Sequence, residues 1–133
     1  MKEHGGNIVN ISSVGAFHTN QILGTYDITK SALLHLTRQL AAELAPGVRV
    51  NALCPGLVKT DFARALWADG RGDEVAQGYP LKRLGEPEDI APAVLFLASD
   101  ASIWITRPAI FSSRCRRACS PPAIGTPSGR VSV

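Results

Sequence analysis

Two patterns of apolar residues in the first half of the chain predict two strands and a helix between them. Residues 6–13 (GNIVNISS) are short, apolar and β-branched, which is typical of a buried strand. Residues 25–45 instead repeat apolar side chains three and four positions apart, which predicts one long helix. The Pro-Gly pair at 46–47 ends that helix, and residues 48–54 (VRVNALC) predict a second strand before another Pro-Gly pair.

The predicted helix begins at Thr25, whose hydroxyl is a suitable N-cap. Its apolar positions at helical spacing are Ile28, Ala32, Leu33, Leu36, Leu40 and Leu44. We expect the four leucines of this set to face the core. A helix of this length between two strands is most often a right-handed crossover in a parallel sheet, so the sequence predicts an α/β fold.

The carboxyl ends of the two strands are where chemistry is expected. In open α/β sheets ligands bind outside these ends, so the loops that follow Ser13 and Cys54 are expected to share one crevice. Residues 62–78 predict one or two short helices that cover this crevice as a lid. Residues 86–89 begin a further helix with acids and a proline in its first turn, and residues 109–111 predict a brief strand.

Length and composition limit the class of protein. At 133 residues, 45% hydrophobic and 19% charged, with a mean hydropathy of +0.07, the chain suits one soluble domain. No apolar run approaches the roughly 18 residues of a membrane span, and residues 1–6 do not resemble a secretory signal. We therefore expect a cytoplasmic protein that does not enter a membrane.

The net charge of +3 is unevenly distributed along the chain. Residues 1–106 carry 9 basic and 11 acidic side chains, whereas residues 107–133 carry 5 arginines and no acid. Binding of nucleic acid by this basic tail is disfavoured, because Phe111 is its only aromatic residue. The tail also contains Cys115 and Cys119, but every histidine lies far upstream, so we expect reduced thiols and no metal site.

A tyrosine and a lysine at the start of the predicted helix are the first candidate for chemistry. Tyr26 and Lys30 are four residues apart, so their side chains share one face. A tyrosine hydroxyl is a weak acid at neutral pH, and a neighbouring cation favours its ionised form. An isolated pair of this kind is usually a surface contact, but here it follows the strand that ends at Ser13, which favours a site for a carbonyl and alcohol pair.

Four runs of sequence together resemble the short-chain dehydrogenases/reductases: NIVNISS, YDITKSALLHLTRQLAAELA, VRVNALCPGLVKTDF and RLGEPEDIAPAVLFLASDAS. The resemblance covers residues 5–106, with the serine, the Tyr-x-x-x-Lys and the Pro-Gly motif in the family's order and spacing. Within the family, CPGLVKTDFARALW and PLKRLGEPEDIA look like the NADP-dependent carbonyl reductase/retinol dehydrogenase branch. The implied fold is the C-terminal half of a Rossmann-like, doubly wound parallel sheet.

The resemblance implies hydride transfer between NAD(P)H and a carbonyl compound or secondary alcohol. Tyr26 would be the general acid/base, and Lys30 would favour its ionisation and hold the nicotinamide ribose. Ser13 would position the substrate oxygen, with Ser12 as the alternative serine. The implied partners are a small-molecule substrate and further copies of the chain, packed through the outer face of the helix of residues 25–45.

Four residues after the second strand match the loop that holds the nicotinamide carboxamide in this family: Pro55, Gly56, Val58 and Thr60. Val58 would act through its backbone and Thr60 through its hydroxyl. The implied cofactor is NADP or NAD, and the branch resemblance favours NADP.

Five further residues have both a functional and a structural interpretation. His18, Asn20 and Gln21 occupy the loop that often touches substrate in this family, although polar loop residues are usually just solvated. Phe62 and Trp67 either line the substrate pocket or pack beneath a surface helix.

The sequence also departs from the family at both ends. It has no strand followed by a G-x-x-x-G-x-G turn, which receives the cofactor pyrophosphate, and no upstream catalytic asparagine. Without that half the first strand is expected to expose an unpaired edge, which predicts poor solubility or partner-dependent folding. After Thr106, residues 107–133 are interpreted as a disordered extension or the product of a reading-frame change. The alternative to an active enzyme is a catalytically silent fragment that acts, if at all, by associating with full-length subunits.

Overall fold

The computed structural model describes residues 5–19 and 21–112. Along the chain the elements are β1 (Gly6–Ile11), the 3-10 helix η1 (Val14–Phe17), α1 (Gly24–Leu44), β2 (Val48–Pro55), α2 (Arg64–Trp67), α3 (Arg71–Gly78), α4 (Pro87–Ala98), the 3-10 turn η2 (Asp100–Ser102) and β3 (Ala109–Ser112). The predicted strand, long helix and second strand are therefore confirmed. So are the pair of short helices, the helix that follows residues 86–89 and the brief third strand.

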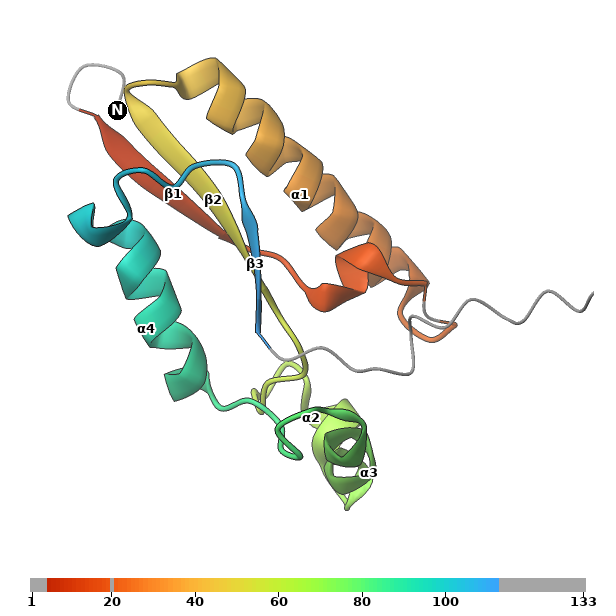
Figure 1. Cartoon of the computed structure of the whole chain (residues 1–133). Coiled ribbons are helices and arrows are strands. Elements are labelled where there is room, and N and C mark those ends of the chain that lie inside the picture. Colours follow the sequence, from red (N-terminus) through yellow and green to blue (C-terminus); the bar gives the residue numbers. More distant parts are fainter. Residues whose placement is uncertain (1–4, 20, 113–133) are drawn as a thin grey trace, which may run out of the picture.

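The three strands form one parallel sheet in the order β1-β2-β3. Figure 1 shows α1 covering one face of this sheet and α4 lying on the other. The central strand β2 is buried along its whole length except at Arg49, because it has a strand on each side and a helix on each face. This is the predicted α/β fold with flanking helices. Within the described residues β1 has β2 on one side and no strand on the other.

The start of α1 and its buried face both differ from the sequence prediction. The helix begins at Gly24 with Leu23 as its N-cap and no side-chain cap, so Thr25 lies inside the first turn and does not cap the helix. Beyond the first turn its buried side chains are Leu34, Thr37 and Ala41, not the expected leucines.

The expected leucines take up a range of environments along the same helix. Leu33, Leu40 and Leu44 are half-buried beside the core, whereas Leu36 is 48% exposed. The core stripe accepts a threonine because the Thr37 hydroxyl donates to the Leu33 carbonyl at 2.8 Å and accepts from the Asn10 amide at 2.9 Å. Burying a hydroxyl that makes both of these hydrogen bonds costs little free energy. A pattern of apolar residues alone therefore did not identify the buried face of α1.

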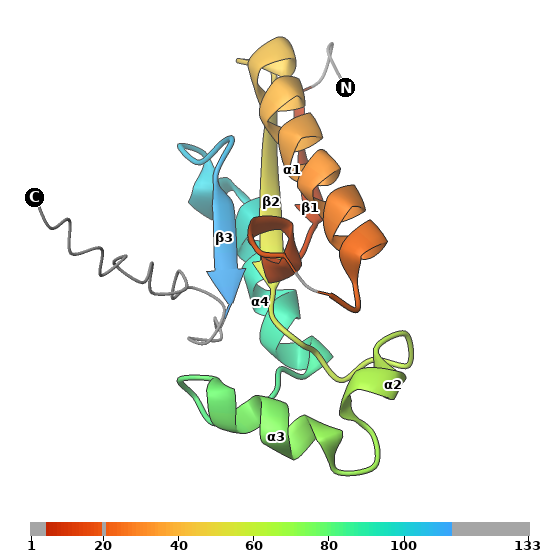
Figure 2. The same cartoon turned by 90° about the vertical axis from the view of Figure 1, so that its right-hand side faces the viewer.

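The short helices lie beyond the carboxyl ends of β2 and β3, as both views show (Figure 2). They have a small core of their own, made of Ala76, Tyr79 and Leu84 with Trp67 packed against it. Trp67 thus follows the structural interpretation, in which the aromatic ring supports a surface helix.

The helix α4 is tied to the sheet at its C-terminal end. The Arg49 guanidinium donates to the carbonyls of Leu97, Ser99 and Ile105 at 3.0–3.3 Å. A cation at this end complements the helix dipole and satisfies carbonyls that have no partner within the helix. No helix in the described part of the chain is long and apolar enough to cross a membrane.

Backbone pairing continues past Thr106 into β3. The Arg107 N–H donates to the Val50 carbonyl at 2.8 Å, and Ala109 pairs with Ala52. Arg107 has a φ of 74°, which is the left-handed region that side-chain-bearing residues rarely adopt. Residues 107–112 of the predicted tail therefore lie against β2, and its remainder, with Cys115 and Cys119, lies outside the described residues.

Candidate active site

The tyrosine and lysine meet as their spacing predicts. Both are half-buried on the first turns of α1, and the Lys30 Nζ lies 5.5 Å from the centroid of the Tyr26 ring. The same Nζ donates to the Ile11 carbonyl at 2.9 Å, which is the last carbonyl of β1. The lysine is therefore held between the end of a strand and the tyrosine, rather than extended into solvent.

The two serines after β1 have different environments. Ser12 is buried, its Oγ donates to the Lys30 carbonyl at 2.9 Å, and its N–H donates to the Leu53 carbonyl at 2.8 Å. Ser13 is half-buried and caps η1, with its Oγ accepting from the Gly15 N–H at 3.1 Å. Because that bond uses the oxygen as an acceptor, the Ser13 hydroxyl proton stays available for another group.

Side-chain bonds join the end of β1 to the start of α1. Besides the bonds made by Ser12 and Lys30, the Ser31 Oγ donates to the Ala16 carbonyl at 2.8 Å. We call residues 11–16 and 27–31, with these bonds, the clasp. The clasp fixes the turn that carries Ser13 against the helix that carries Tyr26. Sequence reasoning missed Ser31, because a serine inside a helix has no distinctive signal.

The clasp also contains a carboxylate that the sequence reasoning did not single out. Asp27 is only 7% exposed, and among the described residues its buried Oδ2 has no hydrogen-bond partner. The side chain lies against Gly15, at the place where a β-carbon on that glycine would be. The only available signal was an acid in the first turn of a helix, where it is common because it suits the helix dipole.

A buried thiol lies behind the two serines. Cys54 is fully buried near the end of β2, and this burial raises the pKa of its thiol. Hydrogen bonds with the Ser12 side chain and the Ser13 backbone, together with the charge of Arg38, act in the opposite direction. The thiol is therefore protonated at neutral pH and has a packing role.

Of the four residues predicted after the second strand, one ends β2 itself and the other three lie on the loop that follows it. Pro55 is the buried last residue of β2, and Gly56 follows it. Val58 forms a parallel bridge with Gly85, through bonds made by its two neighbours, so its own N–H faces away from Gly85. In the described residues this N–H donates to no acceptor.

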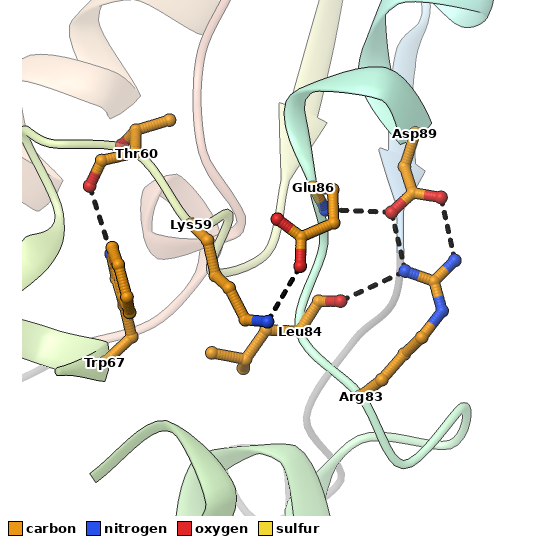
Figure 3. Close-up of polar contacts among 7 residues, drawn as sticks. All are labelled: Lys59, Thr60, Trp67, Arg83, Leu84, Glu86 and Asp89. Atoms are coloured by element: carbon orange, nitrogen blue, oxygen red, sulfur yellow. Dashed lines mark hydrogen bonds and ion pairs between the residues drawn. The ribbon is translucent and has the colours of Figure 1, made fainter. Parts of the chain in front are cut away.

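Thr60 is fixed by backbone contacts on both sides. Its N–H donates to the Val58 carbonyl at 2.9 Å, and its carbonyl accepts from the Trp67 indole at 3.0 Å (Figure 3). Its Oγ1 accepts a long bond of 3.3 Å from the Ala63 N–H, which leaves the hydroxyl proton available.

Surface ion pairs connect this loop to the start of α4, as Figure 3 shows. Lys59 and Glu86 pair at 2.7 Å, and the Arg83 guanidinium makes two bonds of 2.6 and 2.7 Å to Asp89. The bonds from Arg83 hold the pKa of the Asp89 carboxyl well below its usual range. The Asp89 Oδ2 also accepts from the Glu86 N–H at 2.8 Å, which caps the helix.

Two aromatic residues link the loop to its surroundings. The buried Tyr79 accepts at its hydroxyl from the Leu57 N–H at 2.7 Å, a contact that the sequence did not signal. The Phe62 ring, although 86% exposed, lies 6.2 Å from the Tyr26 ring centroid to centroid. The loop after β2 therefore reaches the tyrosine on α1, as expected for segments that share one crevice.

The loop predicted to touch substrate is only partly described. The His18 N–H donates to the Gly15 carbonyl at 3.2 Å and closes η1, and Gln21 is exposed. Asn20 lies outside the described residues.

Comparison with known proteins gives consistent matches. A family model described as "Enoyl-(Acyl carrier protein) reductase" matches residues 1–112. The curated protein "Dehydrogenase/reductase SDR family member 4" of Sus scrofa is 48% identical over 107 residues, which cover 79% of this chain and 38% of that protein. The chain thus spans about two fifths of the length of this curated relative.

Solved structures of dehydrogenases also align with most of this chain. A short-chain type dehydrogenase/reductase from Mycobacterium ulcerans aligns with a TM-score of 0.75 and 42% identity, over 83% of this chain and 41% of that one. A structure described as an NAD(P)-dependent gluconate 5-dehydrogenase from Beutenbergia cavernae, with NADP bound at low occupancy, aligns with a TM-score of 0.78 and 39% identity. That alignment covers 82% of this chain and 45% of the other.

Proposed function

This chain belongs to the short-chain dehydrogenase/reductase family, and we propose that it carries the catalytic residues of an enzyme that transfers a hydride between NAD(P)H and a carbonyl compound or secondary alcohol. The observation that carries this proposal is the clasp, which holds the Ser13 turn, Tyr26 and Lys30 together at the carboxyl end of the sheet. Ligands of open α/β sheets bind at that end.

The proposed reaction needs one proton donor, one orienting donor and one cation. In the direction of reduction the carbonyl carbon receives the hydride and the carbonyl oxygen takes the proton of the Tyr26 hydroxyl, so that an alcohol forms. The Ser13 hydroxyl donates a hydrogen bond to the same oxygen. The Lys30 ammonium stabilises the negative charge left on the tyrosine. Oxidation of the alcohol follows the same steps in reverse.

The donors around the site suit a nicotinamide cofactor, which supplies the hydride when bound. Lys30 has three N–H groups and donates one of them to Ile11, so the others remain for ribose hydroxyls. The Val58 N–H and the Thr60 hydroxyl remain for the acceptor atoms of a carboxamide. Pro55 and Gly56 turn the chain between these two groups of donors.

The remaining assignments extend this proposal. The cofactor is NADP or NAD, with NADP favoured, and the substrate is a small carbonyl compound or alcohol. The enzyme acts in the cytoplasm as a homo-oligomer. An oligomer is supported by the outer face of α1, where Ile28 is 70% and Leu36 48% exposed.

The test is a titration of the purified chain with NADPH and then NADH, followed by the fluorescence of Trp67 and Trp104. Saturable micromolar binding is expected, with loss of binding in Lys30→Ala and retention in the matched surface variant Lys82→Ala. If the chain turns over butane-2,3-dione with NADPH, Tyr26→Phe is expected to lower kcat by about 10²–10⁴-fold, because the proton donor is lost.

The second candidate is a silent subunit that associates with full-length relatives. It is favoured by the apolar side chains that α4 leaves uncovered, with Leu95 70% and Phe96 42% exposed. A folded chain that binds neither cofactor would contradict the catalytic proposal and support this one. Co-purification with a full-length relative, lost in Leu95→Glu, would then be expected.

A further inference from the structure

Asp27 is a buried acid for which the proposed reaction has no use. It lies one residue after Tyr26 and is more than nine-tenths buried, and no residue in the described part of the chain forms a hydrogen bond with its Oδ2. A buried carboxyl group without full hydrogen bonding is unfavourable. Such a group persists only where the surrounding structure holds it in place, so its position calls for a specific explanation.

The contacts of Asp27 lead to the turn that begins at Ser13. A β-carbon built on Gly15 would lie 3.1 Å from the Asp27 Cγ and closer still to its Oδ1. The same point lies 3.4 Å from the Ser13 Oγ. The carboxylate therefore fills the space beside Gly15, and only a residue without a side chain can approach it so closely.

Gly15 is also the residue that fixes the Ser13 oxygen. Its N–H donates to the Ser13 Oγ at 3.1 Å, so the direction of that N–H decides which lone pair of the oxygen is occupied. The direction left for the hydroxyl proton follows from this choice. A shift of Gly15 would therefore turn the Ser13 hydroxyl, although Ser13 itself is unchanged.

The backbone of Asp27 is held within α1. Its N–H donates to the Leu23 carbonyl at 2.8 Å in the first turn of α1. One turn further on, the Ser31 hydroxyl holds the Ala16 carbonyl. The turn thus contacts α1 at two points on its inner side, a hydrogen bond at Ala16 and a close side-chain contact at Gly15.

We propose that Asp27 is a positioning residue for Ser13: its side chain supports Gly15 and so directs the Ser13 hydroxyl at the reacting oxygen. This inference rests on the proposed function for the role of Ser13, but the contact between Asp27 and the turn does not depend on activity. The support comes from the volume of the side chain, which an asparagine at this position would keep and an alanine would remove.

The first experiment measures amide hydrogen exchange of Gly15 by NMR in the full chain. Asp27→Ala is expected to speed exchange at Gly15 by about tenfold, because the turn loses its support and opens locally. Asp27→Asn, which keeps the volume, is expected to stay within about twofold of the parent. Asp100→Asn, an exposed acid elsewhere, serves as the matched control and leaves Gly15 unchanged.

The second experiment asks whether Asp27 acts through Ser13. Turnover of butane-2,3-dione with NADPH is measured in the parent, Asp27→Ala, Ser13→Ala and the double variant. Asp27→Ala is expected to lower kcat by about tenfold and leave KM for NADPH unchanged. In the Ser13→Ala background the same change is expected to alter kcat by less than about twofold, since residues that act as a unit are not additive.

A third variant keeps the proposal testable if Asp27→Ala does not fold. Gly15→Ala places a methyl group against the carboxylate, so it is expected to reproduce the fast exchange of the turn. In the double variant with Asp27→Asn, exchange in the turn is expected to stay fast, because the asparagine keeps the side-chain volume that clashes with the new methyl group.

The outcomes separate the two proposals. Unchanged Gly15 exchange in Asp27→Ala, or additive losses of kcat, would overturn the positioning role. Accelerated exchange in a chain that binds no cofactor would contradict the proposed function and leave the contact between Asp27 and the Ser13 turn established.

Discussion

The clasp and the α2–α3 segment (residues 57–85) both lie toward the carboxyl end of the sheet, but they are held in different ways. The clasp is fixed by side-chain bonds to backbone carbonyls, and β2 lies directly behind it. The α2–α3 segment has its own small core, and the bridge of Val58 with Gly85 joins its two ends to each other. The exposed Lys59–Glu86 pair links it to the start of α4. Exposed ion pairs contribute little to stability.

This difference separates two requirements of a catalytic site. Groups proposed to exchange protons must keep their geometry, and Tyr26 and Ser13 are carried by the helix and strand that share the main core. A lid over substrate, as predicted for the α2–α3 segment, must open, and we therefore expect few attachments of this segment to the main core. We therefore expect the α2–α3 segment to open without unfolding of the sheet.

The largest expected effect comes from breaking the core behind the clasp. Leu34 is 4% exposed and packs with Ala52 and Cys54, so Leu34→Ala is expected to lower the free energy of unfolding by about 2–5 kcal/mol. Urea denaturation followed by circular dichroism measures this loss. Leu36→Ala, on the exposed side of the same helix, is the control and should change stability by less than about 1 kcal/mol. Equal losses in both variants would contradict the observed burial.

Thiol labelling compares the opening of the two regions directly. In a background with Cys115→Ser and Cys119→Ser, Cys54 reports on the clasp, and an added Ala76→Cys reports on the α2–α3 segment. Burial and a raised pKa protect Cys54, so its labelling is expected to follow global unfolding. A cysteine at position 76 should react at least about tenfold faster, through local opening. Similar rates at both sites would show that the two regions open together.

A smaller effect is expected at a contact inside the α2–α3 segment, between Tyr79 and Leu57. Tyr79→Phe removes the acceptor of the Leu57 N–H, and an unpaired buried N–H costs about 1–3 kcal/mol. Thermal denaturation should show this loss, and hydrogen exchange should place it at Leu57 rather than in β1. Tyr26→Phe removes a hydroxyl from a half-buried position and should leave the melting temperature nearly unchanged.

The smallest effect concerns acid pH and the pair of Arg83 with Asp89. The folded-state pKa of Asp89 is lowered by the hydrogen bonds from Arg83, so its contribution to stability is present above the unfolded pKa of about 3.9. That contribution is lost as the pH falls below this value. In urea denaturation at pH 7 and pH 3, Asp89→Asn is expected to show a slightly smaller loss of stability than the parent. An identical pH dependence in both proteins would mean that the exposed pair is fully screened.

The strands and helices followed from the sequence because their signals are local. Pro-Gly pairs, β-branched runs and an acidic first turn each act on the residues beside them. The buried face of α1 was predicted wrongly because the helix has two apolar stripes. Leu36 and Ile28 belong to the exposed stripe, while Leu34 and Ala41 pack on the sheet. Periodicity counts both stripes and does not say which one meets the strands.

The candidate site was predictable only where a motif carried it. Tyr26 and Lys30 have a spacing that geometry explains, and they do lie together. Asp27 and Tyr79 were missed, because their contacts with Gly15 and Leu57 join segments that are far apart in sequence. The residue types alone do not predict contacts between such distant segments. The role of Ser13 in catalysis remains a prediction that the experiments above address, and the roles of Pro55 and Thr60 in cofactor binding remain predictions.

The left-handed backbone of Arg107 has a consequence for how the chain responds to selection. A residue with a β-carbon held at a φ of 74° carries a strain of about 1 kcal/mol, and glycine carries none. A library randomised at position 107 and selected for soluble expression should therefore be enriched first in glycine, then in asparagine and aspartate. Valine and isoleucine should disappear earliest. The frequency of each residue type among the selected clones would thus report the φ angle that the fold requires at position 107.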